Sequence, residues 1–308
     1  MTSSVRIIVR LEVKGPNLVK GLCFDGFRVL GHPETFASIY DDDGADEFLY
    51  VDTVASLYQR SPQFDVIRRI AAKTTVPLTV AGGIRSIEDI HSVLRAGADK
   101  VAINTAALAT PDFLKVASGR FGSQCIAVSI EAHQNSNGQY ECWTNFGRQK
   151  SGVDVFEWAE RVVNLGAGEI IVSAVHNDGL GVGFDVELTR RIATASPVPV
   201  VASCGAGSPE HFRDVIVKGK ADAVAAAAIF HYQAAKPVDR MWMSYDGAQL
   251  RNGDPADSGN IEFLNCGYGG IRELDVKPTS VGDVKRYLAA HGLPVRISAD
   301  AVRIQACP

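Results

Sequence analysis

The chain has 308 residues, of which 46% are hydrophobic and 21% are charged, an ordinary globular composition with enough apolar material for a large core. Its formal net charge of -4 argues against nucleic acid or an anionic membrane as a partner. There is no apolar run long enough to cross a bilayer, no signal peptide and no Cys-x-x-Cys pair among the six cysteines. We therefore expect a cytoplasmic protein with reduced thiols, no metal and no cofactor.

Short apolar, β-branched segments alternate with longer amphipathic segments along the chain. The expected strands cover residues 6–12, 47–52, 77–81, 100–104, 125–131, 169–174, 198–203 and 223–227, and the expected helices cover residues 33–44, 62–73, 86–96, 110–120, 154–166, 186–195 and 208–218. Eight buried strands alternating with helices favour an α/β fold whose parallel sheet closes into a (β/α)8 TIM barrel. An open doubly wound sheet is the alternative.

The last expected helix comes late in the chain. It covers residues 280–292, and it follows a segment of about 233–279 that has polar clusters but also several aromatic side chains. Because disordered linkers are poor in aromatic residues, we expect an ordered insert before the last helix. The prediction is a single barrel domain over residues 1–308 with a short tail at 297–308.

The chain also repeats itself once. Asp43–Leu49 parallels Leu165–Ile171 at an offset of 122 positions, and Pro77–Gly83 parallels Pro199–Gly205 at the same offset. A single long repeat of this kind indicates a barrel built from two similar halves. It also supports closure of the sheet, because each half would supply four strands.

Glu12 and Glu131 each end an apolar strand, 119 positions apart, so the repeat predicts one carboxylate from each half in a shared site. Paired carboxylates can serve as general acid and general base when their surroundings separate their pKa values. The alternative is that either glutamate is a structural ion-pair member, with Arg10 or Lys14 as its partner. The repeat favours the catalytic interpretation.

Glycines and small residues follow several strands, at the end of the barrel where active sites lie. They fall into two sets, and each set can bring backbone N–H groups close to an anion. The first set is Gly82, Gly83, Asn104 and Thr105, and the second is Asp178, Gly179, Gly205, Gly207 and Ala228. One set alone would indicate only tight turns, whereas two sets related by the repeat predict a ligand with a phosphate at each end.

Lys20 lies in the segment 14–21 that follows the first strand. A long first loop there would close over a substrate and bring a cation to it, and a solvated surface lysine is the equal alternative. Four other charged residues each begin a strand and so lie at the opposite end of the barrel: Arg6, Glu47, Lys100 and Glu169. Charges at that end need partners, so the simplest prediction for them is a stabilising ring of salt bridges.

Several motifs are similar to those of one known family. They include Leu18–Gly21, Gly82–Ser86, Gly97–Val101, Ile103–Ala106, Arg120–Cys125, Gly205–Gly207 and Ile229–His231. On these motifs the chain resembles the cyclase subunit of imidazole glycerol phosphate synthase, HisF, over about residues 5–232 and again at the closing helix. The resemblance implies a (β/α)8 barrel that pairs with a HisH-like glutaminase subunit and receives ammonia from it through the barrel.

The resemblance also implies a reaction and roles for residues. Ammonia would attack a bisphosphorylated ribulosyl aminoimidazole carboxamide (PRFAR), giving imidazole glycerol phosphate and aminoimidazole carboxamide ribotide (AICAR) in histidine biosynthesis. Glu12 and Glu131 would take the acid and base positions, with Lys20 beside them. The four strand-start charges would form the gate for ammonia, and Asp99 matches a position that contacts the glutaminase.

The chain departs from the family near the expected site. Glu12 and Glu131 stand where the family has aspartate, which moves each carboxylate by one methylene. Arg10 replaces a cysteine, Cys204 a glycine and Ala228 a serine. An unchanged gate below an altered site supports a second hypothesis, a HisF-like channelling subunit that delivers ammonia to another acceptor such as a surface-polysaccharide sugar.

Overall fold

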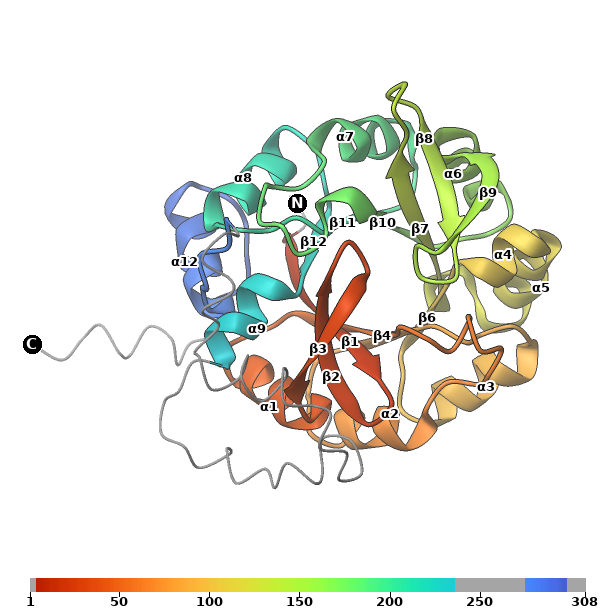
Figure 1. The fold of residues 1–308 in the computed structure, drawn as a ribbon, viewed down its shortest axis with the longest axis horizontal. Coiled ribbons are helices and arrows are strands. Elements are labelled where there is room, and N and C mark those ends of the chain that lie inside the picture. The colour runs from red at the N-terminus through yellow and green to blue at the C-terminus, as the bar shows by residue number, and fades with distance from the viewer. Residues whose placement is uncertain (1–3, 236–274, 298–308) are drawn as a thin grey trace, which may run out of the picture.

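The computed structural model describes residues 4–235 and 275–297, and its centre is a closed ring of parallel strands (Figure 1). The ring runs β1-β4-β5-β6-β7-β10-β11-β12, and β12 pairs back to β1. Its members are β1 (Arg6–Lys14), β4 (Glu47–Asp52), β5 (Leu78–Ala81), β6 (Lys100–Ile103), β7 (Ile126–Gln134), β10 (Glu169–Ala174), β11 (Val200–Ser203) and β12 (Ala223–Ala226). The expected (β/α)8 barrel is confirmed, and the open sheet is wrong.

Helices surround the ring. They are α1 (Pro33–Asp42), α2 (Phe64–Ala71), α3 (Ile87–Arg95), α4 (Thr105–Ala109), α5 (Asp112–Phe121), α6 (Val155–Asn164), α7 (Val186–Ala195), α8 (Pro209–Val217), α9 (Ala228–Ala234) and α12 (Val281–Ala290), with 3-10 turns η1 (Ser123–Cys125) and η2 (Val175–Asn177). Their starts follow capping chemistry: Ser86 and Asp89 form a capping box on α3, and Asp154 caps α6. The helix expected at 110–120 is α5 alone, because Pro111 separates it from α4.

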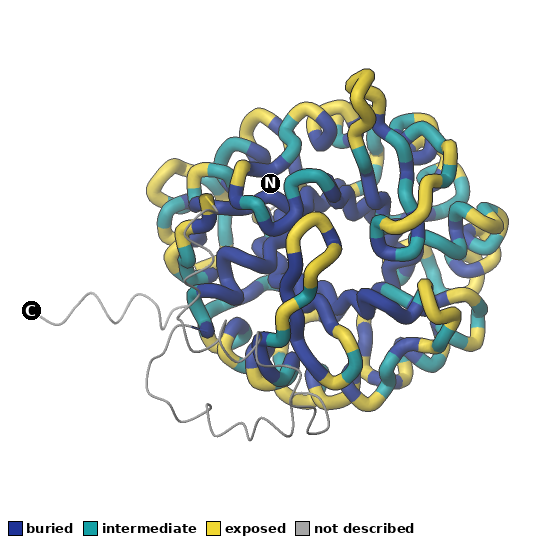
Figure 2. The backbone as a smooth tube through the Cα atoms, viewed as in Figure 1, coloured by how far each residue is buried: buried dark blue, intermediate teal, exposed yellow. Residues whose placement is uncertain are grey.

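The barrel strands are buried on both faces, which explains their nearly continuous apolar sequences. Outward side chains such as Ile7 and Val9 pack against the helices, while inward side chains such as Ile8, Ala102 and Ala225 form a separate cluster inside the barrel. Alternation along each strand creates these two clusters. Figure 2 shows the buried strands at the centre and the exposed surfaces on the surrounding helices.

Each half also carries an antiparallel hairpin that the predicted elements miss. β2 (Asn17–Leu22) and β3 (Asp25–Gly31) follow β1, and β8 (Tyr140–Thr144) and β9 (Gln149–Asp154) follow β7. The long first loop expected over 14–21 is therefore wrong, since most of it is strand. The first hairpin turns at two residues of positive φ without a glycine, so the sequence lacks the usual Asn-Gly signal.

The closing helix α12 lies within the range expected for it. Lys285 anchors it, because its ammonium donates to the carbonyl of Gly44 at 2.6 Å and to the carboxylate of Asp46 at 2.7 Å. α9 extends into the start of the predicted insert, while residues 236–274 of that insert and 298–308 of the predicted tail lie outside the described residues. In the part of the chain that is described, no helix is long and apolar enough to span a membrane.

Candidate active site

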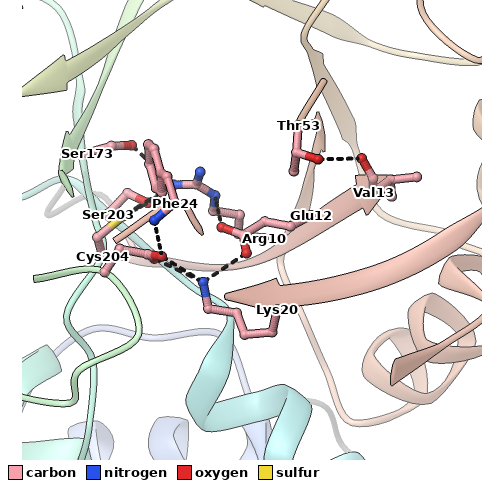
Figure 3. Close-up of polar contacts among 10 residues, drawn as sticks. Arg10, Glu12, Val13, Lys20, Phe24, Thr53, Ser173, Ser203 and Cys204 are labelled. Carbon is pink, nitrogen blue, oxygen red and sulfur yellow. Dashed lines mark hydrogen bonds and ion pairs between the residues drawn. The ribbon is translucent and has the colours of Figure 1, made fainter. Parts of the chain in front are cut away.

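Glu12, near the end of β1, lies in a buried ion-pair cluster (Figure 3). Its carboxylate accepts a hydrogen bond from the Lys20 ammonium at 2.8 Å, and Lys20 also donates to both oxygens of Asp178, at 2.8 and 3.1 Å. Hairpin β2–β3 folds back beside β1 and so carries Lys20 inward, where it is only 2% exposed. The interpretation of Lys20 as a solvated surface lysine is therefore wrong.

Burial and the neighbouring charges act against each other in this cluster. Burial raises the pKa of the Glu12 carboxyl, and the cations Lys20 and Arg10 oppose that rise. Burial lowers the pKa of Lys20, but the carboxylates of Asp178 and Glu12 outweigh it, so the pKa of the ammonium is raised overall. Lys20 is thus a fixed cation near neutral pH.

Arg10 is the second cation of the cluster and points from β1 into the barrel. Its Nε lies 3.2 Å from a carboxylate oxygen of Glu12, so the ion pair considered as an alternative role for Glu12 is present. Its Nη1 donates to the hydroxyls of Ser173 and Ser203, both at 3.2 Å. The guanidinium lies over the ring of Phe24, 4.7 Å from its centroid, and the residue is 3% exposed.

Glu131, on β7, has different surroundings from Glu12. It accepts a hydrogen bond from the backbone N–H of Gly147 at 2.8 Å, and it lines a pocket. Burial raises the pKa of the Glu131 carboxyl to about 7, and the bond from Gly147 limits that rise. A carboxyl with this pKa can both give and accept a proton near neutral pH.

The pocket that Glu131 lines is the larger of two pockets around Arg10, with an empty volume of about 730 Å³. Its walls include the whole first predicted set together with four charged residues, and these residues are Gly82, Gly83, Asn104, Thr105, Arg10, Asp52, Arg85 and Glu131. A Cβ on Gly83 would meet the carbonyl of Arg60 at 2.7 Å, and its φ is +76°, so this turn requires glycine. Among the described residues, Oδ1 of Asn104 is buried without a hydrogen-bond partner.

A smaller pocket of about 260 Å³ lies on the other side of Arg10. Its walls include most of the second predicted set and two cations: Asp178, Gly179, Gly205, Ala228, Arg10 and Lys20. Cys204 also lines it, with a φ of +79° at the position that corresponds to Gly82 in the repeat, a backbone conformation that is strained for any residue but glycine. Apart from Gly207, the two predicted sets therefore line two pockets that share the Arg10 guanidinium as a wall.

Two predicted residues have other surroundings. Gly207 lies outside the walls of both pockets, and its carbonyl accepts a hydrogen bond from the backbone of Lys277 at 2.7 Å. Asp99 is exposed at the opposite end of the barrel, where its carboxylate accepts from the backbone N–H of Leu78 at 2.8 Å. Asp99 thus stabilises the start of β5 as well as being accessible.

The four strand-start charges form a closed ring at that opposite end. Arg6 donates to both Glu47 and Glu169. Lys100 completes the ring, with its ammonium 2.7 Å from Glu47 and 2.8 Å from Glu169. Burial raises the pKa of the Glu169 carboxyl, but Arg6 and Lys100 outweigh it, so the net shift is downward. The predicted salt-bridge ring is present.

Comparison with known proteins gives the family of this barrel. A family model described as "Histidine biosynthesis protein" matches residues 6–236. The imidazole glycerol phosphate synthase subunit HisF of Legionella pneumophila is 46% identical over 210 residues, which cover 68% of this chain and 99% of that protein. The same subunit of Geobacillus kaustophilus is 48% identical over 229 residues, which cover 74% of this chain and 91% of that protein. The chain belongs to the HisF family.

The sequence of this HisF family member does not predict that Arg10 lies at the centre of the site. It predicts Arg10 only as an ion-pair partner of either glutamate and as a departure from the family. The available signal is that Arg10 is a charged residue at an inward position of an apolar strand, where its repeat counterpart, 119 positions on, is Ser129. In the described part of the chain, no group of three or more His, Cys, Asp or Glu side chains is arranged to hold a metal ion.

Proposed function

We propose that the chain is the cyclase subunit of an imidazole glycerol phosphate synthase. It converts PRFAR to imidazole glycerol phosphate and AICAR in histidine biosynthesis, using ammonia from a HisH-like glutaminase. The observation that carries the proposal is the contrast between Glu12 and Glu131 at one face of a HisF-family barrel. Glu12 forms ion pairs with two cations, Lys20 and Arg10. Glu131 instead faces a pocket, and the pKa of its carboxyl is about 7.

The roles of the site residues follow from their surroundings. Glu131 acts as the general acid and base, because its carboxyl changes protonation near neutral pH. Glu12 stays bound to Lys20 and Arg10 and supplies a fixed negative charge beside the reacting groups. The glycine turns on either side of Arg10 take the two phosphates of PRFAR, one in each pocket.

Ammonia enters at the other end of the barrel in this proposal. The ring of Arg6, Glu47, Lys100 and Glu169 surrounds the barrel axis and serves as the gate. The glutaminase docks at that end, and the exposed carboxylate of Asp99 contributes to its interface.

One observation favours a second candidate function, the delivery of ammonia to a different acceptor. Arg10 and Glu12 form a buried ion pair at the centre of the site. They stand where the family has cysteine and aspartate. The ring at the other end keeps all four charges. A changed site above an unchanged gate is what a channelling subunit with another acceptor would show.

The test is PRFAR consumption by the purified chain in excess ammonium salt at alkaline pH, where free ammonia bypasses both partner and channel. We expect turnover by the wild type and a loss of about 10²-fold or more in Glu131→Gln, the scale of general acid–base catalysis. Glu160→Gln, at an exposed position of α6, is the matched control and should retain full activity.

The outcomes separate the two candidate functions. Turnover that survives Glu131→Gln unchanged would remove Glu131 from the chemistry. No turnover by the folded wild type, even with a glutaminase partner added, would reject the cyclase and favour another acceptor.

A further inference from the structure

The interior of the barrel is asymmetric between the ring and the candidate active site. On one side, small inward side chains lead upward from Lys100: Ala102 on β6, and Ala127 and Ser129 on β7, which end at Glu131. Ala102, Ser129 and Glu131 all line the larger pocket, so that pocket reaches down into the interior along these strands. Between Lys100 and Glu131, this side of the interior is thus lined by small side chains.

On the other side, the long side chain of Arg10 crosses the interior and forms one wall of the smaller pocket. β12 also carries small inward residues, Ala223 and Ala225, but the side chain of Arg10 extends across them to reach Ser203 on β11 and Ser173 on β10. The guanidinium is fixed there by Glu12 and covered by Phe24 (Figure 3). Arg10 is only 3% exposed, and Glu12, Ser173 and Ser203 hold its guanidinium in place. Its side chain therefore occupies this part of the interior.

The internal repeat shows that the asymmetry comes from β1. Ala102 and Ala225 are counterparts, 123 positions apart, and both are buried inside the barrel. Arg10 and Ser129 are counterparts too, 119 positions apart. Ile8, which also faces the interior, corresponds to Ala127 at that same offset. β1 therefore places two larger side chains, Ile8 and Arg10, where β7 has Ala127 and Ser129, and Arg10 is the one that reaches across to β10 and β11.

We infer that Arg10 is a positioning residue that closes one half of the barrel interior and directs ammonia to emerge beside Glu131. This inference deepens the proposed function and rests on it. Ammonia that passes the ring follows β6 and β7 into the larger pocket, next to Glu131. It does not emerge beside Glu12, whose carboxylate is already occupied by Lys20 and Arg10.

The repeat supplies a matched pair of variants for the test. Ala102→Leu narrows the open side, whereas Ala225→Leu adds the same atoms to the side that Arg10 already closes. PRFAR turnover is measured twice for each variant, with glutamine plus the glutaminase subunit and with ammonium salt alone. We expect Ala102→Leu to lower the ratio of glutamine-driven to ammonium-driven turnover about tenfold or more, since a narrow apolar constriction blocks passage. Ala225→Leu also narrows the smaller pocket, so it should lower both turnovers together and leave that ratio unchanged.

Double variants test Arg10 itself. Adding Arg10→Ser to Ala102→Leu removes the larger of the two β1 side chains on the other side and should raise the ratio again, although total turnover falls because Glu12 loses a cation. Adding Arg10→Met keeps the bulk without the charge and should leave the ratio low. A purely structural role of Arg10 would give both double variants the same ratio. Because added methylenes can strain a core, thermal unfolding checks each variant, and Ala102→Val replaces any that does not fold.

A second measurement does not depend on the reaction. Crystals of the wild type under xenon pressure should bind xenon beside Ala102 and not beside Ala225, and Arg10→Ser should gain the second site. If the wild type turns over no PRFAR with ammonium, the proposed function is rejected. The xenon result then still decides whether the interior is open beside Ala102 or beside Ala225. Xenon beside Ala225 in the wild type, or equal ratios for the two leucine variants, would overturn the inference.

Discussion

Phe24 and Phe146 stack on each other over the mouth of the barrel, with ring centroids 4.2 Å apart and planes 24° from parallel. They lie 122 positions apart, at the turns of the two hairpins, and both have positive φ, +64° and +59°. The internal repeat thus extends beyond the barrel strands to these hairpins. Because both rings lie over the Arg10 guanidinium, a ligand that joins the two pockets has to pass this stack.

Lys20 should be essential for stability as well as activity. Lys20→Met leaves the buried carboxylates of Glu12 and Asp178 without their shared ammonium, so we expect the free energy of unfolding to fall by about 3–5 kcal/mol. Urea unfolding measures the loss. Lys218→Met, which removes an exposed pair with Asp214, is the control and should change stability by less than about 1 kcal/mol. Similar losses in both variants would contradict the view that Lys20 neutralises this cluster.

Glu131 should make stability depend on pH. Its folded pKa of about 7 lies above the ordinary value of 4.5, so between these values the folded state binds more protons than the unfolded state. The free energy of unfolding therefore falls as pH rises through this window, by at most about 3 kcal/mol from this group. Gln cannot ionise, so Glu131→Gln should gain stability relative to the wild type between pH 5 and pH 8, by roughly 2 kcal/mol.

Urea unfolding of both proteins at several pH values in that range tests this expectation. Glu160→Gln, whose carboxylate is exposed, should show no such trend relative to the wild type. A constant difference between wild type and Glu131→Gln from pH 5 to pH 8 would mean that Glu131 ionises at its ordinary pKa. In that case its role as acid and base near neutral pH would lose its physical basis.

The barrel and its two charged ends could be predicted because they depend on local patterns. Strand periodicity places Glu12 and Glu131 at one end and the four ring charges at the other. The first hairpin could not be predicted, since its turn at Cys23 and Phe24 adopts positive φ without glycine. The partners of Arg10 could not be predicted either, because Ser173 and Ser203 lie 163 and 193 positions away in the chain.

Lys220 offers a stabilising substitution. It is exposed, with a φ of +55°, at the point before β12 where the corresponding positions before other strands are Gly44, Gly97 and Gly166, all of positive φ. A left-handed conformation costs a residue with a Cβ on the order of 1 kcal/mol, and glycine avoids that cost. We expect Lys220→Gly to raise the free energy of unfolding by about 0.5–1 kcal/mol, measured in urea. Lys220→Ala keeps the Cβ and should give no gain, so equal gains would point to the lost charge instead.

Lys100 should affect coupling to the glutaminase and not the chemistry. Lys100→Ala leaves Arg6 as the cation that Glu47 and Glu169 share and opens the ring, so ammonia can leak at the entrance. We expect glutamine-driven turnover to fall about tenfold while ammonium-driven turnover stays within about twofold, because the ring is remote from Glu12 and Glu131. Lys115→Ala, on the exposed face of α5, is the control and should change neither. Equal losses in both assays would instead mean that the ring supports the fold of the whole barrel, and its role as a gate would have to be abandoned.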